Sequence, residues 1–469
     1  MNISAPEQLE TLTRAELRGL VQELWLLSTQ QQAEIAQLKA ELARLQQPPP
    51  TSRNSGQPPS RDQKAQPTNP PARKKHGPPL GHERHVRPLV ETPDCVLPAP
   101  VSSCQSCHAD LQGVTPVQIQ RRQITELPRA KPVVIETQQH EVICPHCQTL
   151  NRGVLPPGLE AERQFGPQLE ATVVYLKQPQ HLSYERTVQT MHDLFGVTLS
   201  EGGASSIVER ASRQAQPQAE LIKQAVRTSP HIQSDETSAR VGAGNWWQWV
   251  FRSAAGVYHT VVPRRNAQVI ADFMGDAVAE VWSCDCYSAQ LKAPAAVCQL
   301  CLAHQLRDLQ RVLDADAQHI WAADMQKFFR EAIHLNNRFD CAAPALTLPG
   351  YLRRVTELEN RLDRLLAVEV AGERASGLRK RFLLHRDKLL VFLSYPGVPP
   401  TNNASEQALR TSVIHRKVTN GFRSEWGAQG YAALQSIIAT AQLKGQAVFT
   451  TLVELLGTPV LPFLHTATP

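Results

Sequence analysis

The sequence predicts an α+β protein of several domains, with a mixed β-sheet core, an all-helical insertion, an N-terminal coiled coil and a small cysteine-bearing ribbon. Three observations support this prediction: the length of 469 residues, a leucine repeat near the N-terminus, and alternating strand and helix patterns after residue 229. Because 469 residues exceed one ordinary core, we expect two or more globular parts joined by linkers.

The composition argues against a membrane protein or a secreted one. No apolar run approaches the roughly 18 residues that a membrane span needs, and the N-terminus lacks the basic-then-apolar order of a secretory signal. We therefore expect a cytoplasmic protein in which the ten cysteines are reduced and available to metals. A net charge of +6, with basic residues gathered in several segments, suits a polyanionic partner.

Residues 1–47 are expected to form a coiled-coil, leucine-zipper-like helix. Apolar side chains and one glutamine recur at steps of three and four, which is one stripe of a helix: Leu17, Leu20, Leu24, Leu27, Gln31, Ile35, Leu38, Leu42 and Leu45. The step order between Gln31 and Leu38 is a stutter that locally unwinds a supercoil. A helix docked on its own chain is the alternative, but residues 48–93 form a basic, Pro-rich linker that cannot bury a core. We expect a homo-oligomer, dimeric or higher.

Residues 94–155 are predicted to form a zinc ribbon. Two Cys-x-x-Cys pairs, Cys104 with Cys107 and Cys144 with Cys147, frame strand-like segments at 117–119 and 133–135. Two turns that each present two thiolates can close a tetrahedral Zn²⁺ site, and such a site is structural because no coordination position stays open. Free thiols are the alternative interpretation.

Residues 156–228 are predicted to be helical, as a DNA-binding or packing region. A helix from Tyr184 to Leu194, a turn at Gly196 and an N-cap at Ser200 before a helix through Arg213 resemble helix–turn–helix spacing. Helix pairs joined by short glycine turns are more often simply packed against each other.

Residues 229–315 change to a strand pattern. Strands are expected at 231–235, 247–252, 257–262, 279–285 and 297–302, with a helix at 267–273. Residues 253–256 read as a hairpin turn between the second and third strands. Three antiparallel strands, a helix and further strands fit the first part of an RNase H-like core, with Asp235 and Asp285 at strand ends.

The two aspartates and Glu406 are the candidate catalytic acids. Mg²⁺ prefers oxygen ligands, and two such ions about 3.5–4 Å apart can promote an in-line phosphoryl displacement. Thr401 or Asn402 can cap a helix that presents Glu406 in its first turns, with Arg410 one turn later. Taken singly, each acid has a plainer interpretation, as a turn former or as a glutamate favoured by the helix dipole.

Several motifs in this order resemble the insertion sequence 66 family of DDE transposases. They are Asp235-Glu236-Thr237, Asp285-Cys286-Tyr287, Cys301-Leu302-Ala303-His304, residues 402–410, Arg416-Lys417 and residues 422–428. The resemblance covers nearly the whole chain and implies metal-dependent DNA cleavage at transposon ends, then strand transfer into target DNA. It also implies that Asp235, Asp285 and Glu406 hold two Mg²⁺ or Mn²⁺ ions.

As partners the resemblance implies DNA, both transposon ends and target, and helper proteins of the same element as further candidates. DNA binding implies that the protein is nucleoid-associated within the cytoplasm. Residues expected to contact DNA are His304, Arg410, Arg416, Lys417 and Arg423, with His415 in the same basic cluster. Trp247 and Trp249 fit a sheet core, which leaves Trp426 as a base-stacking candidate.

Two departures from the family pattern concern the second aspartate. Cys284 and Cys286 flank Asp285, and Gln290 stands where the family tends to show tyrosine. A second zinc site could draw on Cys284, Cys286, Cys298, Cys301 and His304. Its thiolates would compete with an oxygen-seeking metal at Asp285, so His304 fits better as a phosphate contact or a structural hydrogen-bonding group.

The remaining segments complete the predicted domains. Residues 316–399 are expected to be an all-helical insertion with an apolar stripe at Leu352, Val355, Leu358, Leu362, Leu365 and Leu366. Its basic residues, either DNA contacts or a solvated face, are Arg379, Lys380, Arg381, Arg386 and Lys388. Residues 400–445 are the second part of the core, with the Glu406 helix, and residues 446–469 are a C-terminal helical segment.

Three alternative functions stay open at this point. The chain could be an RNase H-like nuclease without strand transfer, which a strand-transfer assay with pre-cleaved ends would distinguish. It could be a zinc-dependent DNA-binding protein with an inactive catalytic core, in which case Asp235→Asn and Glu406→Gln would leave cellular activity intact. A coiled-coil scaffold is the third, and it would depend on residues 1–47 alone.

Overall fold

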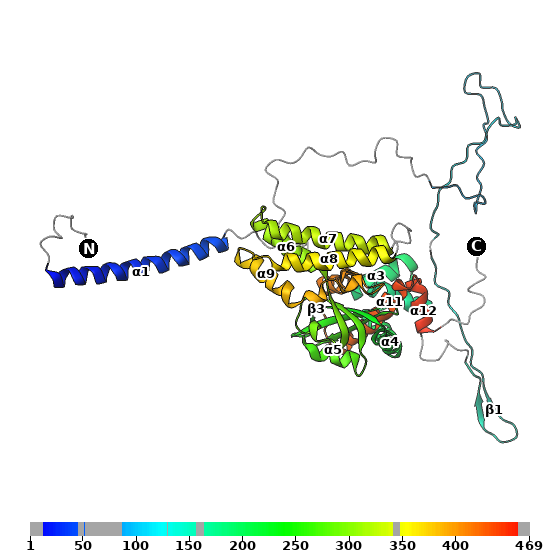
Figure 1. Ribbon diagram of the computed structural model, residues 1–469. Coiled ribbons are helices and arrows are strands. Elements are labelled where there is room, and N and C mark those ends of the chain that lie inside the picture. Colours follow the sequence, from blue (N-terminus) through cyan, green and yellow to red (C-terminus); the bar gives the residue numbers. More distant parts are fainter. Residues whose placement is uncertain are drawn as a thin grey trace. The chain divides into compact units, whose positions relative to one another are not determined.

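Figure 1 shows the protein as a computed structural model, which describes residues 13–45, 51, 87–128, 130–155, 164–340 and 348–457. The chain divides into two compact units. One contains residues 1–63, 136–189 and 199–469, and the other contains residues 64–135 and 190–198. Within the described ranges, no helix combines the length and the apolar character that crossing a membrane requires.

The N-terminal segment is one long helix, α1 (Arg14–Leu45), as the leucine repeat predicts. Leu17, Leu24, Leu27, Ile35 and Leu38 of the stripe are 37% to 57% exposed. Such a row of exposed leucines is what an unpaired coiled-coil strand presents. The pairing of this helix stays a prediction, and most of the predicted linker, residues 52–86, lies outside the described residues.

The cysteine segment contains one short antiparallel hairpin, β1 (Glu141–Ile143) with β2 (Leu150–Arg152). The prediction of strands at 117–119 and 133–135 is wrong. The structure describes both segments, and neither is a strand. Val117 and Val134 are almost fully exposed. A segment rich in β-branched residues forms a strand when it pairs with another strand or packs on a core. These two segments do neither among the described residues.

Three helices follow: α2 (Pro167–Lys177), α3 (Tyr184–Phe195) and α4 (Glu201–Arg227). The predicted cap is confirmed, since Ser200 Oγ accepts a hydrogen bond from the Gly203 N–H at 3.0 Å. Helix α4 continues well past the expected end at Arg213, because its apolar stripe goes on through the buried residues Ala215, Ala219 and Val226.

The core is a mixed five-stranded sheet in the order β5-β4-β3-β6-β7. Its strands and the enclosed helix are β3 (His231–Val241), β4 (Gly244–Arg252), β5 (Val257–Val262), α5 (Ala267–Met274), β6 (Ala279–Cys284) and β7 (Ala295–Leu300). Strands β3, β4 and β5 are antiparallel, and β6 and β7 run parallel to β3. All five expected strands and the helix are confirmed in type and order.

Two strand ends differ from expectation. Strand β3 continues past Asp235 to Val241, because its outer half keeps pairing with β4, so Asp235 lies within the strand. Its pairing with β6, however, stops at Gln233, so Asp235 stands where β3 and β6 part. Strand β6 ends at Cys284, which leaves Asp285 as the first residue beyond it.

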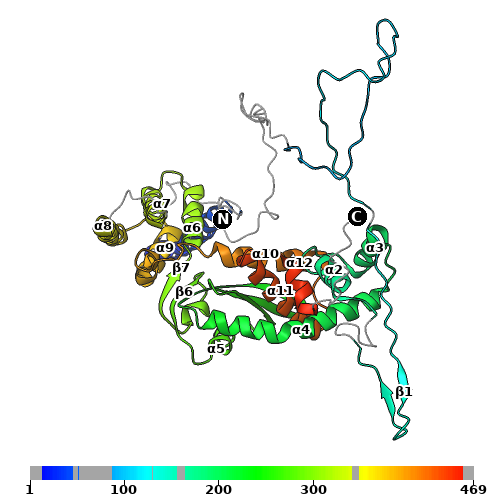
Figure 2. The same cartoon turned by 90° about the vertical axis from the view of Figure 1, so that its right-hand side faces the viewer.

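The two faces of the sheet are covered by different helices (Figure 2). Helices α10 (Asn403–Thr419) and α11 (Glu425–Leu443) pack on one face, against β3, β4 and β5. Helix α5 packs on the other, where Phe251 and Phe273 stack with ring centroids 3.8 Å apart. The predicted sheet-core tryptophans lie on the α5 face: Trp249 is fully buried and Trp247 is half-buried. Each strand thus divides its side chains between an α10 face and an α5 face.

Among its described residues, the segment between β7 and α10 contains helices and 3₁₀ turns joined by short irregular connections, and no strand. It comprises α6 (Leu302–Ala315), α7 (Ile320–Asp340), α8 (Leu348–Ala367), α9 (Glu373–Leu384) and the 3₁₀ turns η4 (Arg386–Lys388) and η5 (Val391–Leu393). Val355, Leu362 and Leu366 of the expected stripe are buried, whereas Leu352 is exposed near the start of α8. Helix α12 (Val448–Leu456) then packs against α2, and residues 458–469 lie outside the described part of the chain.

Candidate active site

Asp235 and Asp285 lie level with each other at the place where β3 and β6 separate. The last parallel pair of these strands is Gln233 with Ser283, and each aspartate is two residues further along its strand direction. Residues two apart face the same side of a sheet, and adjacent strands lie about 4.8 Å apart. The two carboxylates therefore face the same side of the sheet, and Asp235 shares that side with its β4 partner Val250, which packs under α10.

Glu236, the acid next to Asp235, points to the opposite face. Its β4 partner is Trp249, on the α5 side, and its carboxylate is buried. That carboxylate accepts hydrogen bonds from Arg265 Nε at 3.0 Å and from Gln290 Nε2 at 2.7 Å. Glu236 is thus neutralised within the fold, and Asp235 is the acid left on the α10 face.

Glu406 reaches this site from the first turn of α10, and the start of that helix is fixed by Asn402. The buried Asn402 side chain donates from Nδ2 to the Ser234 carbonyl oxygen of β3 at 2.7 Å. Asn402 occupies the expected cap position, but its side chain bonds the sheet instead of the helix. Thr401, the other expected cap, precedes it and does not hold that position.

The electrostatic environment of Asp235 includes the other candidate acids. Burial raises the pKa of Asp235 well above its ordinary value, and the negative charges of Glu236, Asp285 and Glu406 raise it further. On the α10 face, Glu406 Oε1 and Asn402 Oδ1 are buried without a hydrogen-bond partner among the described residues. Mutual repulsion and unpartnered oxygens are relieved by a cation, so these residues fit the divalent ions that the sequence predicts.

Asp285 is held by residues that sequence reasoning missed. The Tyr287 N–H donates to Asp285 Oδ1 at 2.9 Å, and the Tyr287 hydroxyl donates to the Arg265 carbonyl oxygen at 2.7 Å. The Arg265 guanidinium lies over both the Tyr287 ring, at 4.3 Å, and the Trp247 ring, at 4.5 Å. The motif Asp285-Cys286-Tyr287 carried a signal for Tyr287, but only the fold brings Arg265 to it.

Gln290, which stands where the family tends to show tyrosine, is fully buried and hydrogen-bonds residues of two strands. Its Oε1 accepts hydrogen bonds from Ser234 Oγ and from Trp282 Nε1, while its Nε2 donates to Glu236. It therefore links β3 and β6 beneath the two aspartates. A buried amide that satisfies three partners explains why a polar residue is stable at this position.

His304 lies beside Glu406, with 3.7 Å between Nδ1 and Oε1. Burial lowers the pKa of His304, against the opposite effect of Glu406. Arg307 holds the other carboxylate oxygen, with 3.4 Å between Nη2 and Oε2. His304 is thus part of the acid site, and a phosphate contact by this residue stays a prediction.

The five residues considered for a second zinc site do not form one cluster. Cys298 pairs with Trp282 on the α5 face, and its Sγ lies 3.6 Å from that of Cys284. Cys301 and His304 instead adjoin Glu406. Cys284 and Cys298 thus belong to strands β6 and β7, whereas Cys301 and His304 belong to the start of α6.

The basic cluster after Glu406 divides into exposed and buried members. Arg410, Lys417 and Arg423 are exposed, and Arg416 hydrogen-bonds Ser238 Oγ at 2.6 Å and the Ser238 carbonyl oxygen. The prediction that His415 belongs to this basic cluster is wrong. His415 is buried against Tyr431, with ring centroids 4.3 Å apart, and burial lowers its pKa to about 3. It is a neutral core residue and contributes no positive charge. Trp426 is half exposed, at the start of α11.

Most cations of the helical insertion are engaged by neighbouring acids or carbonyls. Arg381 binds Asp308 at 2.5 Å, Arg386 binds Asp363 at 2.7 Å, and Arg379 donates to the Leu366 carbonyl oxygen at 2.8 Å. Lys388 lies 2.5 Å from Asp387, whereas Lys380 is exposed. These contacts favour a structural role for the charges over DNA binding.

The two cysteine pairs belong to different units, Cys104 and Cys107 to one, Cys144 and Cys147 to the other. Each pair forms the same type of turn. The Cys104 N–H bonds the Ala109 carbonyl at 2.9 Å, and the Cys144 N–H bonds the Thr149 carbonyl at 2.9 Å. Backbone N–H groups of Cys107 and Ser106 lower the pKa of the Cys104 thiol. Both turns suit thiolate ligands, and a zinc ion shared by them stays a prediction.

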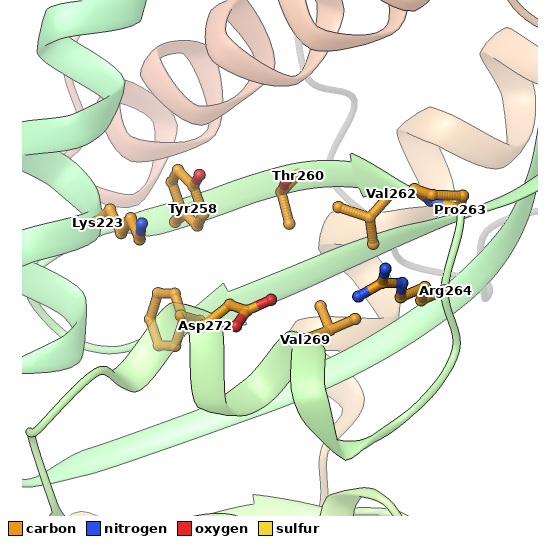
Figure 3. Close-up of a pocket in the computed structure, with 9 residues that line it drawn as sticks. Lys223, Tyr258, Thr260, Val262, Pro263, Arg264, Val269 and Asp272 are labelled. Atoms are coloured by element: carbon orange, nitrogen blue, oxygen red, sulfur yellow. The ribbon is translucent and has the colours of Figure 1, made fainter.

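A hollow of about 230 Å³ lies elsewhere, between β5 and α5 (Figure 3). Its lining includes Lys223, Tyr258, Arg264 and Asp272, and none of the three candidate acids. Because these residues belong to the α5 face, the hollow is separate from the carboxylates on the α10 face.

The fold is α+β, with a mixed five-stranded sheet that carries Asp235 and a helix, α10, that packs on this sheet and presents Glu406. Residues 162–430, more than half of the chain, match the family described as "Transposase IS66 family". The chain belongs to this family.

Two further similarities are found. Residues 4–87 match a "Family of unknown function (DUF6444)". An "Uncharacterized protein y4hP" of Sinorhizobium fredii is 24% identical over 369 residues. This similarity covers 68% of the present chain and 64% of the length of that relative.

Proposed function

We propose that this protein is a DDE-type transposase that cuts DNA at transposon ends and joins the new ends to target DNA. The observation that carries the proposal is the level placement of Asp235 and Asp285 on one sheet face, beneath the helix start that presents Glu406. The charges of Asp285 and Glu406, both distant from Asp235 in sequence, raise the pKa of Asp235, which supports a common site for the three carboxylates.

The sheet supports an RNase H-like assignment for the core. Three antiparallel strands lead into two parallel ones, in the order β5-β4-β3-β6-β7, and the first aspartate lies on the central strand. Helix α10 returns after the helical insertion and packs on β3 and β4. The insertion thus separates the third acid from the other two in sequence while leaving the sheet intact.

In this proposal Asp235 and Asp285 would hold two Mg²⁺ or Mn²⁺ ions, and Glu406 would help to hold one of them. Such ions stabilise the charge on the attacking and leaving oxygens of an in-line displacement. The chain's part is to hold the carboxylates: Tyr287 fixes Asp285, and Asn402 fixes the start of the Glu406 helix. First, water replaces the 3′-oxygen at phosphorus and frees a 3′-OH. That hydroxyl then attacks a target phosphodiester and releases the target's own 3′-OH.

The exposed cations beside α10 are placed to position DNA phosphates. Arg410 lies one turn after Glu406, and Lys417 and Arg423 extend the positive charge along the helix and its following loop. Contacts from such residues orient a strand without reading its sequence. The cysteine turns and the exposed leucine stripe of α1 support a structural Zn²⁺ ion and a dimer that brings two DNA ends together.

The experiment is cleavage of DNA that carries the element's own terminal repeats, with Mg²⁺ or Mn²⁺. Asp235→Asn should reduce the rate by at least about 10³-fold, since the removed charge is a metal ligand common to both ions. Asp276→Asn is the matched control, because Asp276 is an exposed aspartate in the turn before β6. Equal rates for Asp235→Asn and wild-type protein would overturn the proposal. A strand-transfer assay with pre-cleaved ends separates a transposase from a nuclease that only hydrolyses.

A further inference from the structure

A second set of metal-ligating atoms shares Glu406 with the acid site. Cys301 Sγ, a ring nitrogen of His304 and a carboxylate oxygen of Glu406 all lie within 4.8 Å of one another. Among the residues that the structure describes, this is the one group of three or more His, Cys, Asp or Glu side chains whose ligand atoms all lie this close together, and Asp235 and Asp285 do not belong to it. Neither Cys284 nor Cys298 belongs to it.

The two segments that supply these ligands are fixed against each other. Cys301 is the residue before α6, and His304 is in the first turn of that helix. The Leu302 N–H bonds the Pro400 carbonyl at 2.9 Å, and the Asn402 N–H bonds Cys301 Sγ at 3.1 Å. The start of α6 is thereby joined to the start of α10, so the three ligands are held by the same contacts that position Glu406.

The facing atoms of this group are unsatisfied. His304 Nδ1 and Glu406 Oε1 are buried with no hydrogen-bond partner in the described part of the chain. They are 3.7 Å apart, too far for a hydrogen bond between them. Donor atoms around a tetrahedral zinc ion are separated by roughly 3.3–3.8 Å, given bonds of about 2.0–2.3 Å. An ion between these atoms would satisfy both.

The donor types select the metal. Thiolate and imidazole bind Zn²⁺ strongly, whereas Mg²⁺ takes oxygen ligands and avoids sulfur. Arg307 engages Glu406 Oε2, which leaves Oε1 for the ion. The negative charges of Asp285 and Asp308 act on His304 and also favour a cation there. Three protein ligands leave a fourth position for water, so binding should be weaker than at a four-thiolate site.

We infer that Cys301, His304 and Glu406 form a Zn²⁺ site that withdraws Glu406 from the Mg²⁺ centre, so that zinc switches the enzyme off. The site itself stands on the geometry alone, and its inhibitory consequence rests on the proposed function. Zinc occupancy and Mg²⁺ catalysis are then mutually exclusive, because both require the same carboxylate.

The direct test uses Co²⁺ as a spectroscopic substitute for Zn²⁺ in the full chain, after the N-terminal cysteines have been loaded with one equivalent of Zn²⁺. Wild-type protein should bind one Co²⁺ with a thiolate-to-cobalt charge-transfer band, displaced by added Zn²⁺. Cys301→Ser should lose this band, and His304→Gln should weaken Co²⁺ binding by at least about 10-fold. Cys298→Ser is the matched control and should bind as wild type does. A band that survives Cys301→Ser, or vanishes in Cys298→Ser, overturns the inference.

Two further variants separate this inference from the proposed function. Asp235→Asn should abolish DNA cleavage yet keep the cobalt band, whereas Glu406→Gln should weaken both. If DNA cleavage proves independent of Asp235 while the band persists, the proposed function fails and the Zn²⁺ site stands. If cleavage depends on Asp235 but no Co²⁺ binds, the Zn²⁺ site fails alone. If Co²⁺ binds as expected, Zn²⁺ should inhibit DNA cleavage by the wild-type protein at a concentration at least about 10-fold lower than it needs to inhibit Cys301→Ser. Equal Zn²⁺ sensitivity of the two proteins overturns the inhibitory role of the site.

Discussion

The acid site and the cysteine turns are both predicted to bind metals, yet they are built in opposite ways. Asp235, Asp285 and Glu406 come from two strands and a helix that are far apart in sequence, and buried side chains fix them. Each cysteine pair is made within a few residues by its own backbone hydrogen bonds, and the turns are exposed. The acid site therefore depends on the folded core, whereas the cysteine turns depend on local backbone and on the metal itself.

This difference predicts where each site fails. A change in the core should displace Glu406 without touching a ligand, because the start of α10 is held by the buried Asn402 side chain and by hydrogen bonds to the start of α6. A change at a cysteine should release zinc and leave the sheet intact, because the turns contribute nothing to the buried core of the described residues. The predictions below test this contrast.

The largest effect is expected for zinc retained after dialysis against metal-free buffer. Cys104→Ser and Cys144→Ser should each reduce zinc affinity by at least about 100-fold, because a lost ligand costs more than the 10–100-fold typical of residues behind ligands. Cys95→Ser, at an exposed cysteine outside both pairs, should keep one ion per chain. If the two pairs share one ion, dialysis should remove that ion from both single variants and from the double variant. Zinc retained by the Cys104 variant but lost by the Cys144 variant would show separate sites.

The next effect concerns Asn402. Asn402→Ala removes the hydrogen bond to Ser234 and leaves a buried carbonyl unpaired, at a cost of about 1–3 kcal/mol in the free energy of unfolding. A shift of Glu406 by about 1 Å should slow DNA cleavage by about 100-fold. Asn403→Ala changes the next residue, which is exposed, and should do neither. Cleavage by the Asn402 variant within twofold of the wild-type rate would contradict this role.

The smallest effect concerns stability and pH in the metal-free protein. The pKa of Asp235 is raised above 3.8, first by burial. Its protonated form therefore stabilises the fold below that ordinary value, and this stabilisation is lost as the pH rises through the folded-state pKa. At neutral pH, Asp235→Asn should raise the free energy of unfolding by at least about 1 kcal/mol, and the gain should shrink towards pH 4. Asp276→Asn should change little. Denaturation with urea at both pH values measures the difference, and a destabilised Asp235 variant at neutral pH would contradict it.

The same contrast explains how much could be predicted from sequence. Strand alternation and the hairpin turn predicted all five strands, and helix periodicity predicted the helices of the insertion. The three acids could be selected because the sequence places them at predicted strand or helix ends and within motifs that resemble the family pattern. The extension of β3 past Asp235 could not be predicted, since it depends on pairing with β4.

Long-range contacts account for the other failures. His415 looks like a cation in sequence, but Phe422 and Tyr431 from later segments bury its ring. Arg265 and Gln290 gave no local signal, because their roles arise from contacts across the sheet with Glu236. Conversely, the strand-like segment at 133–135 forms no strand, since local β propensity needs a partner.

The most direct test of the central claim is anomalous scattering from crystals of the protein with terminal-repeat DNA and Mn²⁺. The acids should bind two ions, with carboxylate oxygens of Asp235, Asp285 and Glu406 about 2.1 Å from the metals. Anomalous peaks elsewhere in the molecule, with none beside these three side chains under conditions that support cleavage, would contradict the account.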